Sequence, residues 1–315
     1  MSLLRSSGPV KKVPHLRGMQ LQSKEHLPTG SQGLEERMFC GFRPGTITAS
    51  KISQMSIANA VLVTAILLSP TVCSAQVTET GFLDRSLTLD GVEYAYTVYV
   101  PRNYRESESW PVIMYLHGGG YRGTDGTRPT QDALGRMIRR NVDLFPAIVI
   151  FPQAPDDWQR MGAQIAIASL DRTLAEFHTD SSRVYLVGWS MGGNGVWYLG
   201  YHHPERFAAL VPMSGWIRTR ISGGLGYRYP TIPSDESADP FGEVAARVRG
   251  IPTWVFHGEV DPVVPVEDSR LMAAAIEATG TEVHYTEFPG LEHGAVTPAL
   301  EMEELPAWLF SQRRR

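Results

Sequence analysis

The sequence predicts an α/β fold in which a mostly parallel, doubly wound sheet follows an N-terminal antiparallel hairpin. Three observations support this class. Apolar runs of strand length alternate along the chain with stretches of helical periodicity. Two alternating runs at the start of this region are joined by Asp90-Gly91, a pair that favours a tight hairpin. The run Pro111–Leu116 is almost continuously apolar, which is typical of a central strand covered on both faces.

The individual elements follow from these patterns in chain order. The hairpin occupies 82–89 and 92–100, and Pro101 ends its second strand because proline cannot donate to a strand ladder. Further strands are expected at 111–116, 147–151, 183–187, 207–213, 252–256 and 282–287, the last at an edge of the sheet. Helices are expected at about 129–141, 161–178, from 194 onward, 266–279 and 298–312.

A glycine-flanked serine marks the junction between the strand 183–187 and the helix after it. Val187-Gly188-Trp189-Ser190-Met191-Gly192-Gly193 contains the pattern G-x-S-x-G between a strand and a helix, which indicates a nucleophile elbow. Such a turn strains the backbone, and Gly188 and Gly192 remove the Cβ atoms that would collide there. The helix after Ser190 points free N–H groups toward any oxyanion formed near the hydroxyl. We therefore expect Ser190 to be a catalytic nucleophile.

Three consecutive glycines follow the strand 111–116. The segment His117-Gly118-Gly119-Gly120-Tyr121-Arg122-Gly123 has more glycine than a simple turn needs, and glycines are costly to order. Acyl transfer needs two N–H donors where the carbonyl oxygen becomes negative. We expect these oxyanion-hole donors on Met191 and Gly119, with Gly118 as the next choice. A flexible turn is the alternative interpretation of the glycines.

A serine nucleophile needs a base, and in a parallel sheet the base should lie on a loop beyond a later strand. His293 lies on the loop after the last strand, flanked by Gly290 and Gly294. The other candidates are less suitable, because His284 falls within a strand and the histidines at 202–203 end the elbow helix. We expect His293 to be the base.

The base in turn needs an acid to orient it. The loop after the strand 252–256 offers Glu259 and Asp261. The order Ser190, Asp261, His293 is that of serine, acid and histidine in one known fold, so Asp261 is favoured. Each carboxylate could instead be a solvated turn residue.

Four segments together resemble the α/β-hydrolases: His117–Gly119, Gly188–Gly193, His257–Asp261 and Glu292–Gly294. Three further motifs narrow the resemblance, namely Arg122-Gly123-Thr124, Pro152-Gln153-Ala154-Pro155 with Trp158, and Trp254–Gly258. From about Tyr94 to the closing helix, the chain is similar to secreted bacterial esterases known as predicted peptidases, relatives of dienelactone hydrolases, feruloyl and acetylxylan esterases and polyhydroxybutyrate depolymerases. The resemblance implies the α/β-hydrolase fold and a serine esterase without metal or organic cofactor.

Aromatic and glycine residues in or beside these motifs are the expected substrate contacts: Gly118, Tyr121, Trp158, Trp189 and Trp216. The tract 214–240 is rich in Gly, Pro, Ser and Tyr, lacks periodicity and follows the strand after the nucleophile, so it is well placed to cap the site. The relatives join these elements more tersely, which implies a specificity insert over 216–240.

The front of the chain differs from the rest. Residues 1–54 mix Gly, Ser, Pro, Lys and Arg without periodicity, and we interpret them as a disordered extension or a mis-assigned start before Met55. The segment 55–75 pairs a short apolar run with small residues, the layout of a secretory signal with cleavage near Ala75-Gln76. An uncleaved anchor or a buried helix is the alternative. The expected mature chain, 76–315, is a single catalytic domain that is secreted or periplasmic.

Cysteine and charge usage divide at the same point. Both cysteines, Cys40 and Cys73, precede Gln76, so no disulfide is expected after it. The part after Gln76 carries 21 basic and 30 acidic residues, and all the basic ones are arginine. The net charge of −9 argues against binding to nucleic acid or to anionic membranes.

The leading hypothesis is a secreted serine hydrolase that cleaves carboxylic esters through an acyl-enzyme, with plant-polymer (carbohydrate or feruloyl), polyester or small acyl esters as substrates. A serine peptidase is the nearest alternative, because the same three residues can cleave amides; relatives of that kind carry a β-propeller or a peptide-binding domain, which this chain is not expected to hold. A non-catalytic binding protein of the same fold would lack one member of the three, and none is missing.

Overall fold

A computed structural model describes residues 79–221 and 226–314. These residues all fall within the second of two compact units, Ala75–Arg315. The expected extension 1–54, the signal-like segment 55–75 and both cysteines lie outside the described residues. Within the described ranges, no helix combines the length and apolar character needed to cross a bilayer.

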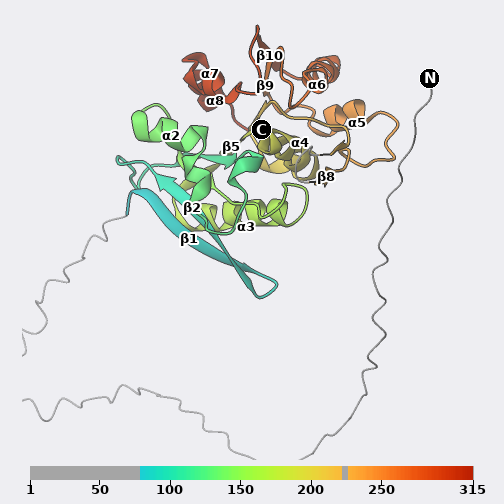
Figure 1. Cartoon of the computed structure of the whole chain (residues 1–315). Coiled ribbons are helices and arrows are strands. Elements are labelled where there is room, and N and C mark those ends of the chain that lie inside the picture. Colours follow the sequence, from blue (N-terminus) through green and yellow to red (C-terminus); the bar gives the residue numbers. More distant parts are fainter. Residues whose placement is uncertain (1–78, 222–225, 315) are drawn as a thin grey trace, which may run out of the picture. The chain divides into compact units, whose positions relative to one another are not determined.

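An eight-stranded sheet forms the centre of this unit (Figure 1). Its order is β1-β2-β4-β3-β5-β6-β9-β10. The first two strands form an antiparallel hairpin and β2 pairs antiparallel with β4, whereas all later neighbours are parallel. The strands are β1 Gly81–Leu89, β2 Val92–Val100, β3 Trp110–Leu116, β4 Ile148–Phe151, β5 Thr179–Trp189, β6 Ala209–Met213, β9 Thr253–Gly258 and β10 Val283–Phe288. The predicted hairpin, the central strand and the edge position of the last strand are thus confirmed.

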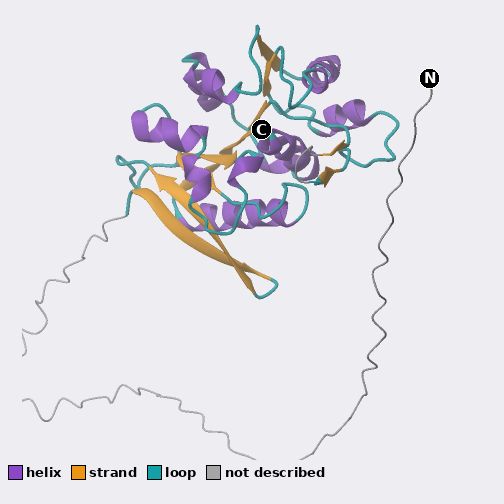
Figure 2. Ribbon diagram, in the orientation of Figure 1, coloured by secondary structure: helices purple, strands orange, loops and turns teal. Residues whose placement is uncertain are grey.

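Helices cover both faces of this sheet (Figure 2). They are α2 Ala133–Arg140, α3 Met161–Glu176, α4 Met191–His202, α5 Pro240–Arg247, α6 Glu267–Ala278, α7 Val296–Glu301 and α8 Glu304–Ser311, with short 3-10 turns η2 Gly119–Tyr121, η3 Arg128–Gln131 and η4 Pro204–Arg206. Strand β3 shows how the two layers arise. Val112, Met114 and Leu116 join a core with α3 and α4, while Ile113 and Tyr115 join a core with α2, α7 and α8, because successive side chains point to opposite faces. Every side chain of β3 is buried.

Two helical predictions were incomplete. The closing helix expected at 298–312 is two helices, α7 and α8, separated at Met302. Pro306 explains the break, because inside a continuous helix its ring would clash with the carbonyl group of residue 302, whereas the first turn of α8 tolerates it. Helix α5 was not predicted, although Asp239 caps it by accepting a hydrogen bond from the N–H of Gly242 and Pro240 occupies its first turn.

The tract 214–240 is not structureless. It carries a small hairpin of β7, Arg220–Ile221, and β8, Arg228–Tyr229. We call the described residues of 216–240 the insert. Its first residues are buried, and the carboxylate of Asp268 on α6 accepts hydrogen bonds from the N–H groups of Ile217 and Arg218. The insert therefore has a fixed attachment to the domain at its start.

Candidate active site

Ser190 occupies a strained turn between β5 and α4. Its φ and ψ are 56° and −116°, and residues with a side chain rarely adopt such a positive φ. Its N–H donates to the carbonyl of Met213 at the end of β6, at 2.8 Å, which holds the turn against the neighbouring strand. A Cβ at Gly188 would lie 2.4 Å from the carbonyl oxygen of Gly192, so the expected need for glycine there is confirmed.

The side chains of Ser190, His293 and Asp261 meet although they come from three separate loops. Oγ of Ser190 lies 2.8 Å from Nε2 of His293, and Nδ1 of His293 lies 2.7 Å from Oδ2 of Asp261. With Asp261 ionised, Nδ1 carries the proton and donates to it, which leaves the Nε2 lone pair facing the serine hydroxyl. The arrangement can remove a proton from Ser190.

Asp261 is buried and accepts several hydrogen bonds. Its Oδ1 accepts from the N–H groups of Val263 and Val264, each at 2.8 Å. Burial alone would raise the pKa of Asp261, but hydrogen bonds from His257, His293 and the backbone hold that pKa below its ordinary value. Asp261 therefore stays ionised at neutral pH and fixes the orientation of His293.

His257, on β9, is a fully buried neighbour of this carboxylate that the sequence did not single out for a role. Its Nε2 lies 2.9 Å from the carbonyl oxygen of Val264 and 3.4 Å from Oδ2 of Asp261. Because a carbonyl only accepts, Nε2 carries the proton, and Nδ1 then accepts from the Ser269 hydroxyl at 2.7 Å. The motif His257-Gly258 was visible in the sequence, but its contact with the acid was not.

Glu259, the other carboxylate of the loop, does not reach His293. Its Oε2 accepts a hydrogen bond from the N–H of Gly290 at 2.7 Å. It thus joins the loop after β9 to the loop after β10. The choice of Asp261 over Glu259 agrees with this geometry.

The loop after β3 is held by a buried histidine. Nε2 of His117 accepts from the N–H of Ala154 at 3.1 Å, and its Nδ1 donates to the carbonyl of Gly118 at 2.8 Å. Burial lowers the pKa of His117 to about 4, against the opposing effect of the Gly118 carbonyl. A neutral imidazole therefore fixes the peptide group that joins Gly118 to Gly119.

The N–H groups expected to stabilise an oxyanion differ in their availability. That of Gly118 donates to Oδ2 of Asp132 at 3.1 Å, so it is already engaged. Met191 is the first residue of α4, where an N–H has no partner within the helix. Leu116 and Gly188 pair at the ends of β3 and β5, so the segments that carry Gly119 and Met191 leave the sheet from neighbouring strands. Because the N–H of Gly118 already donates to Asp132, Gly119 is favoured over Gly118.

Two of the expected substrate contacts have structural roles instead. Trp158 is fully buried, packs its ring 4.8 Å from that of His117 and donates from Nε1 to the His117 carbonyl at 3.1 Å. The expectation that Trp158 contacts substrate is therefore wrong, because the buried side chain packs against and hydrogen-bonds His117 of the glycine loop. A Cβ at Gly118 would lie 2.7 Å from the ring of Trp189, so Gly118 serves close packing rather than substrate contact.

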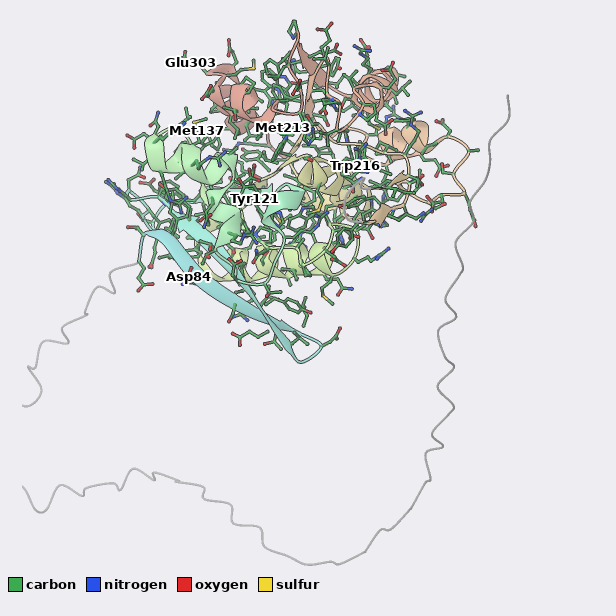
Figure 3. All side chains as sticks on the ribbon, in the orientation of Figure 1. Asp84, Tyr121, Met137, Met213, Trp216 and Glu303 are labelled. Atoms are coloured by element: carbon green, nitrogen blue, oxygen red, sulfur yellow. The ribbon has the colours of Figure 1, made fainter. Side chains whose placement is uncertain are left out.

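Trp189 and Tyr121 are both half-buried, but only Trp189 contacts a reacting group. Nε1 of Trp189 donates to the carbonyl of His293 at 3.2 Å, and the two rings lie 5.3 Å apart. Tyr121 is close to the His117 ring, with its hydroxyl 3.3 Å from Nη1 of Arg136. Figure 3 labels Tyr121, which follows β3, Met213, which ends β6, and Trp216, which follows β6.

Trp216 is only 5% exposed, which leaves little of it to contact a substrate. Its carbonyl accepts from Nδ2 of Asn194 at 3.0 Å, and its ring packs edge-on against that of Tyr229 at 5.1 Å. Oδ1 of Asn194 accepts from Gln159 at 2.9 Å. Trp216 therefore anchors the insert to α4. This role could not be predicted from the sequence, because it depends on long-range contacts.

Comparisons with known proteins give the chain several relatives. The sequence matches the prolyl oligopeptidase family of peptidases over residues 156–310. An uncharacterized secreted protein of Arthroderma benhamiae is 28% identical over 211 residues, which cover 61% of this chain and 22% of that protein. Feruloyl esterase B of Neurospora crassa is 24% identical over 212 residues, which cover 62% of this chain and 63% of that enzyme.

Among solved structures, a thermostable esterase is 30% identical with a TM-score of 0.61, covering 74% of this chain and 63% of its own. The chain thus spans less than two thirds of the length of each of these three relatives. The matches confirm the resemblance expected from the motifs, and the chain has the α/β-hydrolase fold. The chain is thus similar both to esterases and to a peptidase family.

Proposed function

We propose that the chain is a serine hydrolase that cleaves carboxylic esters through an acyl-enzyme on Ser190. The observation that carries this proposal is the pair of hydrogen bonds that joins Ser190 to His293 and His293 to Asp261, at 2.8 and 2.7 Å. A serine at a strained strand–helix turn with a base and an ionised orienting acid is the arrangement that nucleophilic acyl transfer requires. The similarity to a thermostable esterase and a feruloyl esterase favours ester substrates.

The first half of the reaction forms the acyl-enzyme. Oγ of Ser190 attacks the carbonyl carbon of the ester while Nε2 of His293 takes its proton. The carbonyl oxygen becomes an oxyanion and accepts hydrogen bonds from the N–H groups of Gly119 and Met191. The bond to the alcohol then breaks, His293 returns the proton to the leaving alkoxide, and the acyl group remains on Ser190.

The second half reverses the roles with water. His293 takes a proton from a water molecule, whose oxygen attacks the acyl carbon. A second oxyanion forms at the same two N–H groups. When the bond to Oγ breaks, His293 returns the proton to Ser190, and the carboxylic acid leaves with the enzyme restored.

We test this proposal with Ser190→Ala. Turnover of a short-chain 4-nitrophenyl ester should fall by about 10³- to 10⁶-fold, and labelling by a fluorophosphonate probe should disappear. Unchanged circular dichroism would show that the variant is folded. Near-full activity in a folded Ser190→Ala variant would refute the proposal.

A peptidase is the second candidate, because the matching family model is that of prolyl oligopeptidases. Acetyl, feruloyl and hydroxybutyrate esters and a peptide amide, assayed with one enzyme preparation, would separate the two. We expect kcat/KM to be highest for an ester, and a higher value for the peptide would establish the second candidate.

We also propose that the protein is exported, with 55–75 as its signal and cleavage near Ala75-Gln76. A relative named as a secreted protein supports this. N-terminal sequencing of the exported protein should begin near Gln76, and recovery of residues 1–54 on it would contradict the proposal.

A further inference from the structure

We propose that Arg122 is a positioning residue that connects the insert to the glycine loop, residues 117–123, which carries Gly119. Through this connection the insert supports turnover itself and not only substrate choice. The inference rests on the proposed function, in which the N–H of Gly119 stabilises the oxyanion. It adds a residue outside the reacting groups, since Tyr229 of the insert lies 110 residues after Gly119 in the sequence.

The guanidinium of Arg122 lies directly against Gly119. Its Nη1 donates to the Gly119 carbonyl at 3.0 Å. A Cβ built on Gly119 would lie 3.1 Å from Nη1 and 3.4 Å from Cζ of Arg122. The guanidinium therefore packs against the side of Gly119 where other residues carry a side chain. The absence of a Cβ at position 119 thus allows the guanidinium of Arg122 to approach the backbone closely.

Both peptide groups that flank Gly119 are held in this way. The preceding carbonyl, of Gly118, accepts from Nδ1 of His117 at 2.8 Å and from the N–H of Tyr121 at 3.1 Å. The following carbonyl, of Gly119 itself, is held by Arg122. Because glycine has two freely rotating dihedral angles, fixing only the first peptide would leave the second free to turn and to disturb the loop. Arg122 completes the restraint.

The other nitrogens of the same guanidinium reach the rest of the domain. Nε donates to the carbonyl of Asp156, and Nη2 donates to the hydroxyl of Tyr229 on β8. The ring of Tyr227 lies over the guanidinium, with Cζ 4.7 Å from the ring centroid. One planar side chain therefore connects the glycine loop, the loop after β4 and the insert, which a lysine with its single nitrogen could not do.

Tyr229 transmits this connection to the strand that follows the nucleophile. It is 3% exposed, and its ring packs at 5.1 Å on that of Trp216, which lies three residues after the end of β6. The hydroxyl that receives Arg122 is thus held by a buried ring in a fixed position. A change in the insert at Tyr229 should be felt at Gly119, and with it at the oxyanion.

The test compares Tyr229→Phe with Tyr227→Phe, two removals of a single hydroxyl from the same hairpin. Tyr229→Phe keeps the packing on Trp216 but loses the partner of Arg122, whereas Tyr227→Phe keeps the ring that covers Arg122. The substrate is 4-nitrophenyl acetate, whose acyl group is too small to need contacts far from Ser190. We expect kcat to fall by about 3- to 30-fold in Tyr229→Phe with KM within about twofold, and both constants to be unchanged in Tyr227→Phe.

Arg122→Lys provides the second measurement. It should lower kcat by about 10- to 100-fold, since removal of one oxyanion donor costs about 10²- to 10³-fold and this variant only displaces the donor. Adding Tyr229→Phe to Arg122→Lys should lower kcat no further, because both changes break the same connection. The affinity for a boronic acid that mimics the tetrahedral intermediate should fall by the same factor as kcat/KM.

These outcomes distinguish the inference from the proposed function. If fluorophosphonate still labels Ser190 in every variant while Tyr229→Phe matches the wild type in kcat, the serine hydrolase stands and the role of Arg122 is refuted. A loss confined to KM, or additive losses in the double variant, would also refute it. Absence of labelling in the wild-type protein would instead refute the proposed function.

Discussion

Gly192 lies so close to the carbonyl oxygen of Leu116 that a Cβ atom at position 192 would sit 1.9 Å from it. The contact joins the first turn of α4 to the end of β3, so the helix that carries the proposed nucleophile is seated directly on the neighbouring strand. Backbone, rather than a flexible side chain, lies opposite the missing Cβ. No rotation of a neighbouring side chain could therefore make room for alanine at position 192.

Gly192→Ala should accordingly destabilise the domain by about 3 kcal/mol or more, because the backbone of β3 or α4 must shift. Gly120→Ala is the matched control, since a Cβ there meets no atom within 4 Å. Its free energy of unfolding should stay within about 0.5 kcal/mol of the wild type. Urea denaturation followed by circular dichroism measures both, and equal effects of the two substitutions would contradict the proposed packing.

Much of the site was accessible from sequence because glycine spacing and loop order are local signals. The pattern around Ser190 specified a turn, and the parallel sheet specified the edge at which Asp261 and His293 should meet. The contacts that link loops were not accessible. No periodicity shows that His257 touches the acid of its own motif or that Arg122 reaches Tyr229, because each depends on side-chain direction after folding.

Two of the four predicted aromatic substrate contacts disagree with the structure for a related reason. Trp158 and Trp216 stand in or beside the motifs of the site, which makes them candidates for substrate contact. In the structure both are buried, one beneath His117 and the other against Tyr229. A sequence gives the residue type but not the side of the loop to which it points, and a tryptophan close to a site in sequence serves packing as readily as recognition.

The two carboxylates of the loop after β9 should respond differently to neutralisation. Asp261→Asn should lower kcat by about 10⁴-fold, because an amide no longer stabilises the imidazolium of His293 and no longer enforces its tautomer. Glu259→Gln keeps an oxygen that can accept from the N–H of Gly290 and should leave kcat within about twofold. Steady-state kinetics on one ester tests both variants. A comparable loss in Glu259→Gln would mean that the acid has been wrongly assigned.

Trp158→Phe should affect stability and not substrate binding. The variant loses the hydrogen bond from Nε1 to the His117 carbonyl and leaves a small cavity, which together cost about 2 to 4 kcal/mol. KM should remain within about twofold of the wild type for both small and bulky esters, since the ring lies below the loop. Trp308→Phe, which removes an indole hydrogen bond to Glu282 nearer the surface, should cost less. A raised KM specific to bulky esters would restore Trp158 as a substrate contact.

The burial of His117 predicts a specific dependence of stability on pH. Its pKa is lowered from 6.5 to about 4, first by burial and then by the charges of Arg122 and Arg128, against the opposing hydrogen bond to Gly118. In the unfolded chain the imidazole takes up a proton near its ordinary pKa, but in the folded protein only near pH 4. Between these values the unfolded state binds more protons, so the contribution of His117 to the free energy of unfolding should fall by roughly 3 kcal/mol as the pH drops from 6.5 to 4 and stay constant below that range.

His117→Gln removes this titration while keeping an amide that can replace one of the two hydrogen bonds. The variant should be less stable than the wild type at pH 7, but the difference between them should narrow as the pH falls to 4. Urea denaturation at several pH values measures it, with His284→Gln as the control because His284 is exposed on β10 and should follow the wild type. Parallel stability curves for His117→Gln and the wild type would show that His117 does not resist protonation in the folded protein, and would remove the argument that a neutral imidazole fixes the peptide before Gly119.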